Sequence, residues 1–218
     1  MNKLPFKIKE LQFDNKNKNT SFFPLPLRCM IVGASGCGKT TLLYHLITKS
    51  WGISFLNLYI FSPSMEQPIY LKLKEAYREF SVLEGKEIAY FFENCKDIIP
   101  VDECKNNSLV VFDDCVNIRD QNIIMDYFVR GRHKKISCIY LSQNYVRIDK
   151  QLIRGNSNFL CVFEQQPSYI KYIYDEFVGS DFTYNEFKKM CEKCWRQPHG
   201  FLFINRTKEL HNGRYYVR

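Results

Sequence analysis

A glycine-rich turn constrains the fold of this chain more than any other sequence feature. Residues 33–40 read GASGCGKT and match the pattern G-x-x-x-x-G-K-[ST] at every fixed position. The apolar run Arg28–Val32 precedes the turn, and an amphipathic stretch over residues 39–49 follows it. A strand, a glycine-rich loop and a helix in this order favour a phosphate site over a tight turn that binds nothing.

The chemistry of this pattern predicts a site for a nucleoside triphosphate. Glycines let the backbone wrap closely around phosphate oxygens, and successive N–H groups with the helix N-terminus supply positive potential. We expect Lys39 to reach the β- and γ-phosphates and Thr40 to ligate Mg²⁺. The residues predicted to bind ATP are Gly33, Ala34, Ser35, Gly36, Cys37, Gly38, Lys39, Thr40 and Thr41.

Two acidic residues end another strongly apolar run. Residues 108–112 predict a buried strand, and Asp113 and Asp114 follow it. In P-loop nucleotide hydrolases a carboxylate at such a strand end holds Mg²⁺. We assign that role to Asp113 and expect Asp114 to orient or deprotonate the attacking water. The alternative is that one or both acids cap a helix that starts near Asn117.

A basic turn and a further buried strand come next. Residues 129–154 contain seven Lys and Arg residues and one acid, and the buried strand within this stretch ends next to Gln143. We expect Gln143 to sense the γ-phosphate or the lytic water. Arg130, Arg132 and Arg154 are candidates for an arginine finger, and we prefer Arg132 to Arg154. The alternatives are an ordinary polar strand end and a solvated charged face.

Strand patterns alternate with helix patterns along the whole chain. The expected strands are residues 28–32, 57–62, 88–92, 108–112, 136–142 and 159–163, and the expected helices are residues 39–49, 69–80, 168–177 and 183–194 with helical spacing around 123–128. Residues 200–204 and 215–217 predict a terminal hairpin. This pattern predicts an α/β domain with a mainly parallel sheet and antiparallel strands at one edge. Residues 1–26 are expected to form an N-terminal arm and residues 27–218 the domain.

The composition is that of a globular protein, and its positive net charge suggests that it binds a polyanion. The 218 residues carry a formal net charge of +8 and 45% hydrophobic residues, which excludes a chain that is disordered throughout. No apolar run is long enough to span a bilayer, so we expect no membrane association. Because the first residues lack a signal-peptide pattern, we expect an intracellular protein whose nine cysteines are reduced thiols.

Five short segments together resemble a known family. They read GASGCGKT at 33–40, VVFDD at 110–114, GRH at 131–133, SQN at 142–144 and LIRGN at 152–156. In this order they are similar to the poxvirus-type genome-packaging ATPases of the FtsK–HerA superfamily, which occur in large DNA viruses, virophages and Polinton-like elements. The resemblance spans about residues 28–205, and the GRH turn followed by a strand and Gln143 is its discriminating part.

The resemblance implies both a fold and an activity. The fold is a RecA-like P-loop NTPase, a three-layer sandwich. The activity is ATP hydrolysis by a homo-oligomeric ring that moves double-stranded DNA, without sequence preference, into a preformed capsid. By position, Arg132 is the finger and Gln143 the sensor, and Asp114 stands where many members carry Glu. The implied partners are capsid proteins, and the implied location is the host-cell cytoplasm, in the virus factory, or the virion.

Two other readings of the phosphate loop stay open at this point. A nucleotide or small-molecule kinase needs an acceptor pocket and usually an Arg-rich lid, and no such lid stands out. A nucleotide-dependent scaffold would bind ATP without turnover. Separately, Cys191 and Cys194 have metal-like C-x-x-C spacing with His199 and His211 nearby, although two cysteines three residues apart on a helix also arise from packing.

Overall fold

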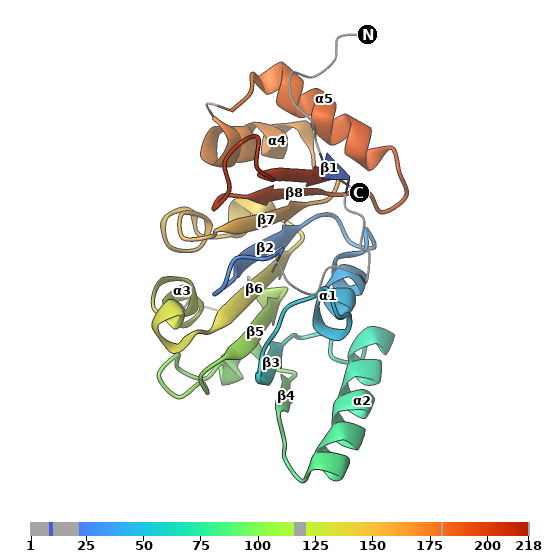
Figure 1. Ribbon diagram of the computed structural model, residues 1–218, viewed down its shortest axis with the longest axis vertical. Helices are drawn as coiled ribbons and strands as arrows, with labels where there is room; N and C mark the ends of the chain where they lie inside the picture. Colours follow the sequence, from blue (N-terminus) through green and yellow to red (C-terminus); the bar gives the residue numbers. More distant parts are fainter. Residues whose placement is uncertain (1–8, 11–21, 116–120, 180, 218) are drawn as a thin grey trace.

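The structure, a computed structural model, describes residues 9–10, 22–115, 121–179 and 181–217 (Figure 1). The segments 1–8, 11–21 and 116–120 lie outside the described residues. They include most of the predicted arm. They also include Asn117, near which the helix capped by Asp113 or Asp114 would start in the alternative interpretation. Within the described part of the arm, β1 (Lys9–Glu10) pairs in parallel with a strand near the C-terminus.

One sheet runs through the whole molecule. Its described strands lie in the order β1-β9-β8-β7-β2-β6-β5-β3-β4. The six strands from β7 to β4 are parallel to one another, whereas β8 is antiparallel to β7 and β9 is antiparallel to β8. The strand bounds are β2 Arg28–Val32, β3 Asn57–Phe61, β4 Ala89–Phe92, β5 Ser108–Asp113, β6 Ser137–Ser142, β7 Phe159–Val162, β8 Leu202–Asn205 and β9 Tyr215–Val217.

Five α-helices of the described residues cover the two faces of this sheet. They are α1 Lys39–Thr48, α2 Pro68–Glu84, α3 Asn122–Val129, α4 Pro167–Ile173 and α5 Tyr184–Trp195. Helices α1 and α2 pack on one face and α3, α4 and α5 on the other (Figure 1). The prediction of an α/β fold with a mainly parallel sheet and a C-terminal hairpin is therefore confirmed, and so are the predicted strands.

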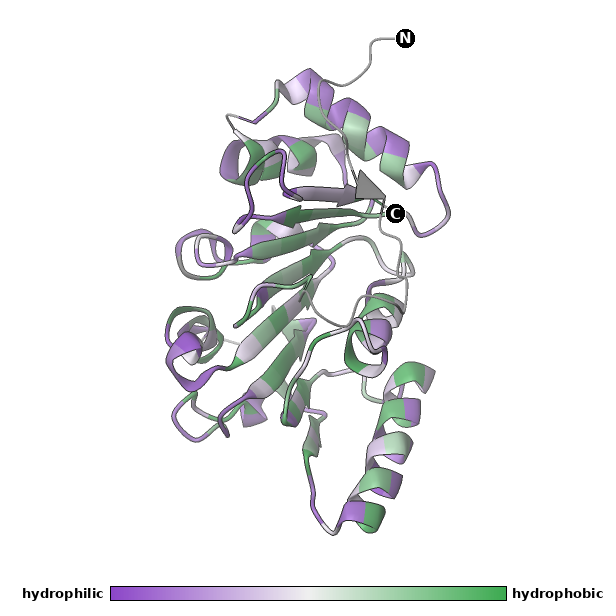
Figure 2. Cartoon of the chain, in the orientation of Figure 1, coloured by the Kyte–Doolittle hydropathy of each residue, from purple (hydrophilic) through white to green (hydrophobic). Residues whose placement is uncertain are grey.

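Alternating side chains along the strands explain this layering. In β2, Met30 and Val32 belong to the core under α3–α5, whereas Cys29 and Ile31 belong to the core under α1 and α2. Successive residues of a strand point to opposite faces, so an apolar run with no polar position must be covered on both. Figure 2 shows this as hydrophobic strands in the middle and more hydrophilic helices outside.

The cysteines differ in part from the expectation. Cys95, in a 3-10 turn after β4, forms a disulfide with Cys115, two residues beyond the end of β5. The prediction that all nine cysteines are thiols is wrong for this pair, because the loops after two strands that flank β3 bring them together. The other seven are free, and six of those are buried.

Candidate nucleotide-binding site

The site forms where parallel strands end at the same edge of the sheet. The phosphate loop follows β2, the two acids lie at the end of β5, and Gln143 follows β6. Because β6 lies between β2 and β5, these three strand ends are neighbours. They enclose a cavity of about 270 Å³ lined by Ser35, Gly36, Gly38, Lys39, Thr40, Thr41, Ser64, Gln67, Ile69, Asp113, Asp114, Leu141, Ser142 and Gln143.

The phosphate loop has the backbone that its glycines predict. Gly38 lies in the left-handed region at φ 109° just before α1 begins, a conformation that favours glycine. A side chain at Gly33 would clash with Cys37 and Phe163, so the loop folds tightly against Phe163, the residue that follows β7. Of the nine predicted residues, six line the cavity, whereas Gly33, Ala34 and Cys37 build the turn behind it.

Lys39 is held inside the loop. Its side-chain nitrogen donates hydrogen bonds to the carbonyl oxygens of Gly33 and Ala34 at 2.7 and 2.8 Å. The residue is only 9% exposed, and it lies on the cavity wall. A buried ammonium group next to a row of backbone N–H groups makes this wall electropositive and suited to an anion.

Asp113 is buried and held by two hydroxyl groups. Its Oδ2 atom accepts hydrogen bonds from Tyr70, at 2.6 Å, and from Ser62, at 3.1 Å. Burial raises the pKa of Asp113, and the two hydroxyl donors act in the opposite direction by stabilising the charged form. Burial and the neighbouring carboxylate also raise the pKa of Tyr70, so this hydroxyl stays a donor.

Asp114 and Gln143 meet across the cavity. The Gln143 side-chain amide donates to Oδ2 of Asp114 at 3.2 Å. Asp114 lies in the left-handed region at φ 55°, and its N–H donates to the carbonyl oxygen of Leu141 at 3.1 Å. This backbone turns the second acid away from the direction of the first, toward the end of β6. The predicted acid and amide are therefore brought together.

The two hydroxyl residues that hold Asp113 are not among the site residues predicted from the sequence. Ser62 directly follows β3, the strand next to β5, and a polar residue at that strand end was a usable signal. Tyr70 lies in the first turn of α2 and is fully buried. Nothing local distinguishes it from an ordinary core tyrosine.

Arg132 lies at the opposite edge of the sheet. It belongs to a 3-10 turn, Gly131–Lys134, just before the amino end of β6, so about 16 Å of strand separates it from Gln143. Its side chain is exposed and makes no ion pair or hydrogen bond with any residue that the structure describes. Arg132 therefore cannot serve the cavity of its own chain.

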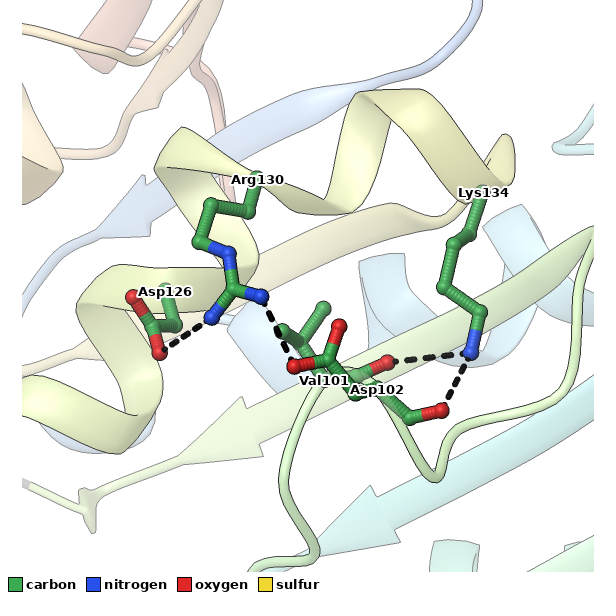
Figure 3. A network of polar contacts seen from close by, with 5 residues as sticks. All are labelled: Val101, Asp102, Asp126, Arg130 and Lys134. Atoms are coloured by element: carbon green, nitrogen blue, oxygen red, sulfur yellow. Dashed lines mark hydrogen bonds and ion pairs between the residues drawn. The ribbon is translucent and has the colours of Figure 1, made fainter.

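The other two arginine candidates are already engaged. Arg130 pairs with Asp102 at 2.7 Å and with Asp126 at 3.2 Å, and beside it Lys134 donates to the carbonyl oxygens of Val101 and Asp102 (Figure 3). Arg154 is buried and pairs with Glu176 at 2.8 Å. Of the three candidates, Arg132 is therefore the one whose side chain has no partner among the described residues, and its role as a finger stays a prediction. Arg130 is half-exposed and paired with two acids, so this part of the basic stretch is a solvated surface whose charge is partly neutralised.

The metal-like C-x-x-C spacing, which packing on a helix also explains, brings together no metal-ligating cluster in the described residues. Cys191 and Cys194 are buried in the core under α5, and the described residues contain no group of three or more metal-ligating side chains. His199 instead contacts the phosphate loop, since its Nδ1 atom lies 3.0 Å from the carbonyl oxygen of Cys37. A carbonyl oxygen only accepts hydrogen bonds, so Nδ1 carries the hydrogen.

Comparison with known proteins places this geometry in a family. The family model described as "Poxvirus A32 protein" matches residues 10–176. Among curated proteins, none matches the sequence significantly. Within the described residues no helix has both the length and the apolar character needed to cross a bilayer.

Solved structures of low sequence identity share the fold. The genome-packaging NTPase B204 of Sulfolobus turreted icosahedral virus 2 superimposes with a TM-score of 0.60 at 11% identity, covering 88% of this chain and 96% of that one. VirB4 of Thermoanaerobacter pseudethanolicus gives a TM-score of 0.58 at 10% identity, covering 85% and 88%. B204 has been seen in complex with the nucleotide analogues AMPPCP and ATP-gammaS.

Proposed function

We propose that this chain, which belongs to the Poxvirus A32 protein family, is a Mg²⁺-dependent ATPase that drives double-stranded DNA into a viral capsid. One observation carries the proposal: the phosphate loop, the buried Asp113 and the Asp114–Gln143 pair all line a single cavity. The proposal is also supported by B204, a genome-packaging NTPase with the same fold.

The cavity offers suitable ligands for a nucleotide and its metal. Mg²⁺ prefers oxygen ligands, and the carboxylate of Asp113 and the hydroxyl of Thr40 supply them on the cavity wall. The ion would neutralise charge on the β- and γ-phosphates. Lys39 is buried beside the loop carbonyls, and its ammonium group would exchange these carbonyl oxygens for phosphate oxygens.

Asp114 and Gln143 are the proposed pair for hydrolysis. Asp114 accepts a proton from the attacking water, and Gln143 orients the carboxylate through its hydrogen bond to Oδ2. Aspartate is shorter than glutamate by one methylene, so the water must lie close to it or be reached through a second water. The left-handed backbone of Asp114 carries this side chain toward β6 and toward Gln143.

Arg132 completes the site of a neighbouring subunit in this proposal. It lies at the amino edge of the sheet, whereas the cavity lies at the carboxyl edge. A head-to-tail contact that joins these two edges generates a ring when the rotation closes. Stabilisation of transition-state charge by such a residue increases turnover about 10³–10⁵-fold. The proposed unit is residues 27–218, preceded by an arm of residues 1–26.

The decisive experiment measures nucleotide hydrolysis with and without duplex DNA. Wild-type protein should hydrolyse ATP only with Mg²⁺ and faster with DNA, whereas Lys39→Ala should lose nucleotide binding and hydrolysis. Phosphoryl transfer to added nucleosides or nucleotides would show a kinase instead. Tight ATP binding without any turnover in the assembled state would show a scaffold. A wild-type rate that is indifferent to DNA would reject the motor.

A further inference from the structure

Helix α5 carries a row of cations that the site described above does not use. Lys189, Lys193 and Arg196 are exposed, and their spacing places them within about 60° of one another around the helix axis. The opposite side of the helix buries its apolar residues, Phe187, Met190, Cys191 and Cys194. The row is about 10 Å long, by the rise of an α-helix.

These cations form no ion pair within the described chain. The side chains of Lys189, Lys193 and Arg196 make no ion pair or hydrogen bond with residues that the structure describes. Of the two acids of the helix, Glu186 is held in a capping box by Thr183 and is only influenced by the charge of Lys189, and Glu192 lies 3.9 Å from Lys188. The basic stretch before β6 differs, since Arg130 and Lys134 are tied to neighbouring acids and carbonyls (Figure 3).

The end of α5 leads directly to the phosphate loop. Trp195, the last helical residue, donates its indole N–H to the carbonyl oxygen of Val162 at 3.2 Å. The chain then makes a tight turn, and a side chain at Gly200 would clash with the carbonyl oxygen of Cys194. His199, in the left-handed region at φ 55°, donates to the carbonyl oxygen of Cys37. Two hydrogen bonds thus connect the helix end to the carboxyl end of β7 and to the phosphate loop.

We propose that the row Lys189–Lys193–Arg196 binds the phosphates of double-stranded DNA and that His199 couples this binding to the phosphate loop. This inference rests on the proposed function and adds to it a DNA-binding surface and a route to the nucleotide. The row is suited to a sequence-independent polyanion because long, flexible cationic side chains neutralise backbone phosphates without reading bases. His199 is a positioning residue: it fixes the loop carbonyl two residues before Lys39.

The binding surface is tested with two triple variants, each of which neutralises three charges: one on α5 and a control on and beside α2. The triple variant Lys189→Gln, Lys193→Gln and Arg196→Gln should bind duplex DNA at least about tenfold more weakly. The slope of the logarithm of its binding constant against the logarithm of the salt concentration should become shallower by up to about 2.7, which is about 0.9 for each lost phosphate contact. The matched control, Lys72→Gln, Arg78→Gln and Lys86→Gln, removes the same charge from exposed positions on and beside α2, at the other end of the molecule (Figure 1). Fluorescence anisotropy at several salt concentrations measures both.

A variant that keeps the three charges tests whether weaker DNA binding results from lost charge or from a disturbed structure. Lys189→Arg, Lys193→Arg and Arg196→Lys together should bind DNA as wild-type protein does. Equal weakening in the α5 triple and in the α2 control would show a general charge effect and overturn the proposed surface. Wild-type affinity in the α5 triple would overturn it as well.

The coupling is tested at His199. His199→Ala should still bind DNA but lose the acceleration of ATP hydrolysis by DNA. His199→Asn should retain the acceleration, because its amide nitrogen replaces Nδ1 and asparagine tolerates positive φ. Full acceleration in His199→Ala, or loss of it in both variants, overturns the coupling. If DNA does not accelerate ATP hydrolysis by wild-type protein, the proposed function itself is rejected. If wild-type protein is accelerated and the α5 triple variant is accelerated equally, only the inference about α5 and His199 is rejected.

Discussion

The hydroxyl of Tyr70 lies 2.6 Å from a carboxylate oxygen of Asp113, so the first turn of α2 supports the acid that ends β5. This contact connects a helix that lies on one face of the sheet to the acid at its carboxyl edge. A donor to a buried carboxylate favours the charged form, which is the form that a metal requires.

Replacement of Tyr70 by Phe should therefore change the pH dependence of the site. Burial already raises the pKa of Asp113, and loss of the tyrosine donor raises it further. As pH falls, Mg²⁺-dependent nucleotide binding should be lost at a higher pH in Tyr70→Phe than in wild-type protein. Titration of binding against pH measures this. Tyr77→Phe on the same helix is the control, and identical acid limbs in the two variants would contradict the assignment.

The raised pKa of Asp113 also predicts a stability effect. A group whose pKa is higher in the folded state than in the unfolded state stabilises the fold at low pH, and this contribution is lost as pH rises through the folded-state pKa. Asp113→Asn should therefore make the nucleotide-free protein more stable than wild type at neutral pH. Thermal melts at neutral and at low pH should show the gain only at the higher pH.

Asp114→Asn should separate nucleotide binding from hydrolysis. Asparagine keeps an oxygen that can accept the hydrogen bond of Gln143, but it cannot take a proton from water. Turnover should fall by about 10²–10⁴ while nucleotide affinity stays close to that of wild type. Steady-state hydrolysis and equilibrium binding measure the two effects. Turnover that remains near the wild-type rate would remove Asp114 from the proton-transfer step.

Arg132→Ala should retain nucleotide binding and lose about 10³–10⁵ in turnover, since it removes the charge offered to the neighbouring site. A mixing experiment tests whether the residue acts between subunits. Mixed with Lys39→Ala subunits, which lack a competent loop but carry Arg132, the Arg132→Ala protein should regain activity. Arg130→Ala, at the residue just before that turn, is the control and should hydrolyse ATP normally. Absence of complementation in mixed assemblies would argue against the head-to-tail contact.

Substitution of Arg154 should reduce the stability of the fold, in contrast to substitution of Arg132, which should reduce turnover. Its guanidinium pairs with Glu176 at 2.8 Å and lies 4.8 Å from the centre of the Tyr145 ring, with 7% of the Arg154 side chain exposed. Arg154→Ala removes the positive charge beside the largely buried carboxylate of Glu176 and leaves it only the hydroxyl of Tyr145. It should lower the free energy of unfolding by about 3–5 kcal/mol. Urea denaturation measures this. A stable Arg154→Ala protein that cannot hydrolyse ATP would restore Arg154 as a finger candidate.

Local patterns were sufficient for the fold class and for much of the cavity. The phosphate loop, the acids after β5 and Gln143 after β6 could all be predicted, because each lies at the end of a strand with a clear apolar pattern. Parallel strands end at one edge of a sheet, so three such ends must converge once the strands are neighbours. Helix ends were less predictable: α2 runs from Pro68 to Glu84, beyond the predicted residues 69–80, because its last turns carry exposed apolar residues with no regular pattern.

What the sequence determined by itself is the phosphate loop and the alternation of strands and helices, since both depend on residues that are close along the chain. Only the tertiary structure decided which hydroxyl groups donate to Asp113, which candidate arginine has no ion pair among the described residues, and what His199 contacts. Tyr70 is 43 residues from Asp113, and His199 is 162 residues from Cys37. Contacts at such separations depend on how the sheet and helices pack together. An apolar strand pattern shows that both faces of the sheet are covered, but not which distant residues cover them.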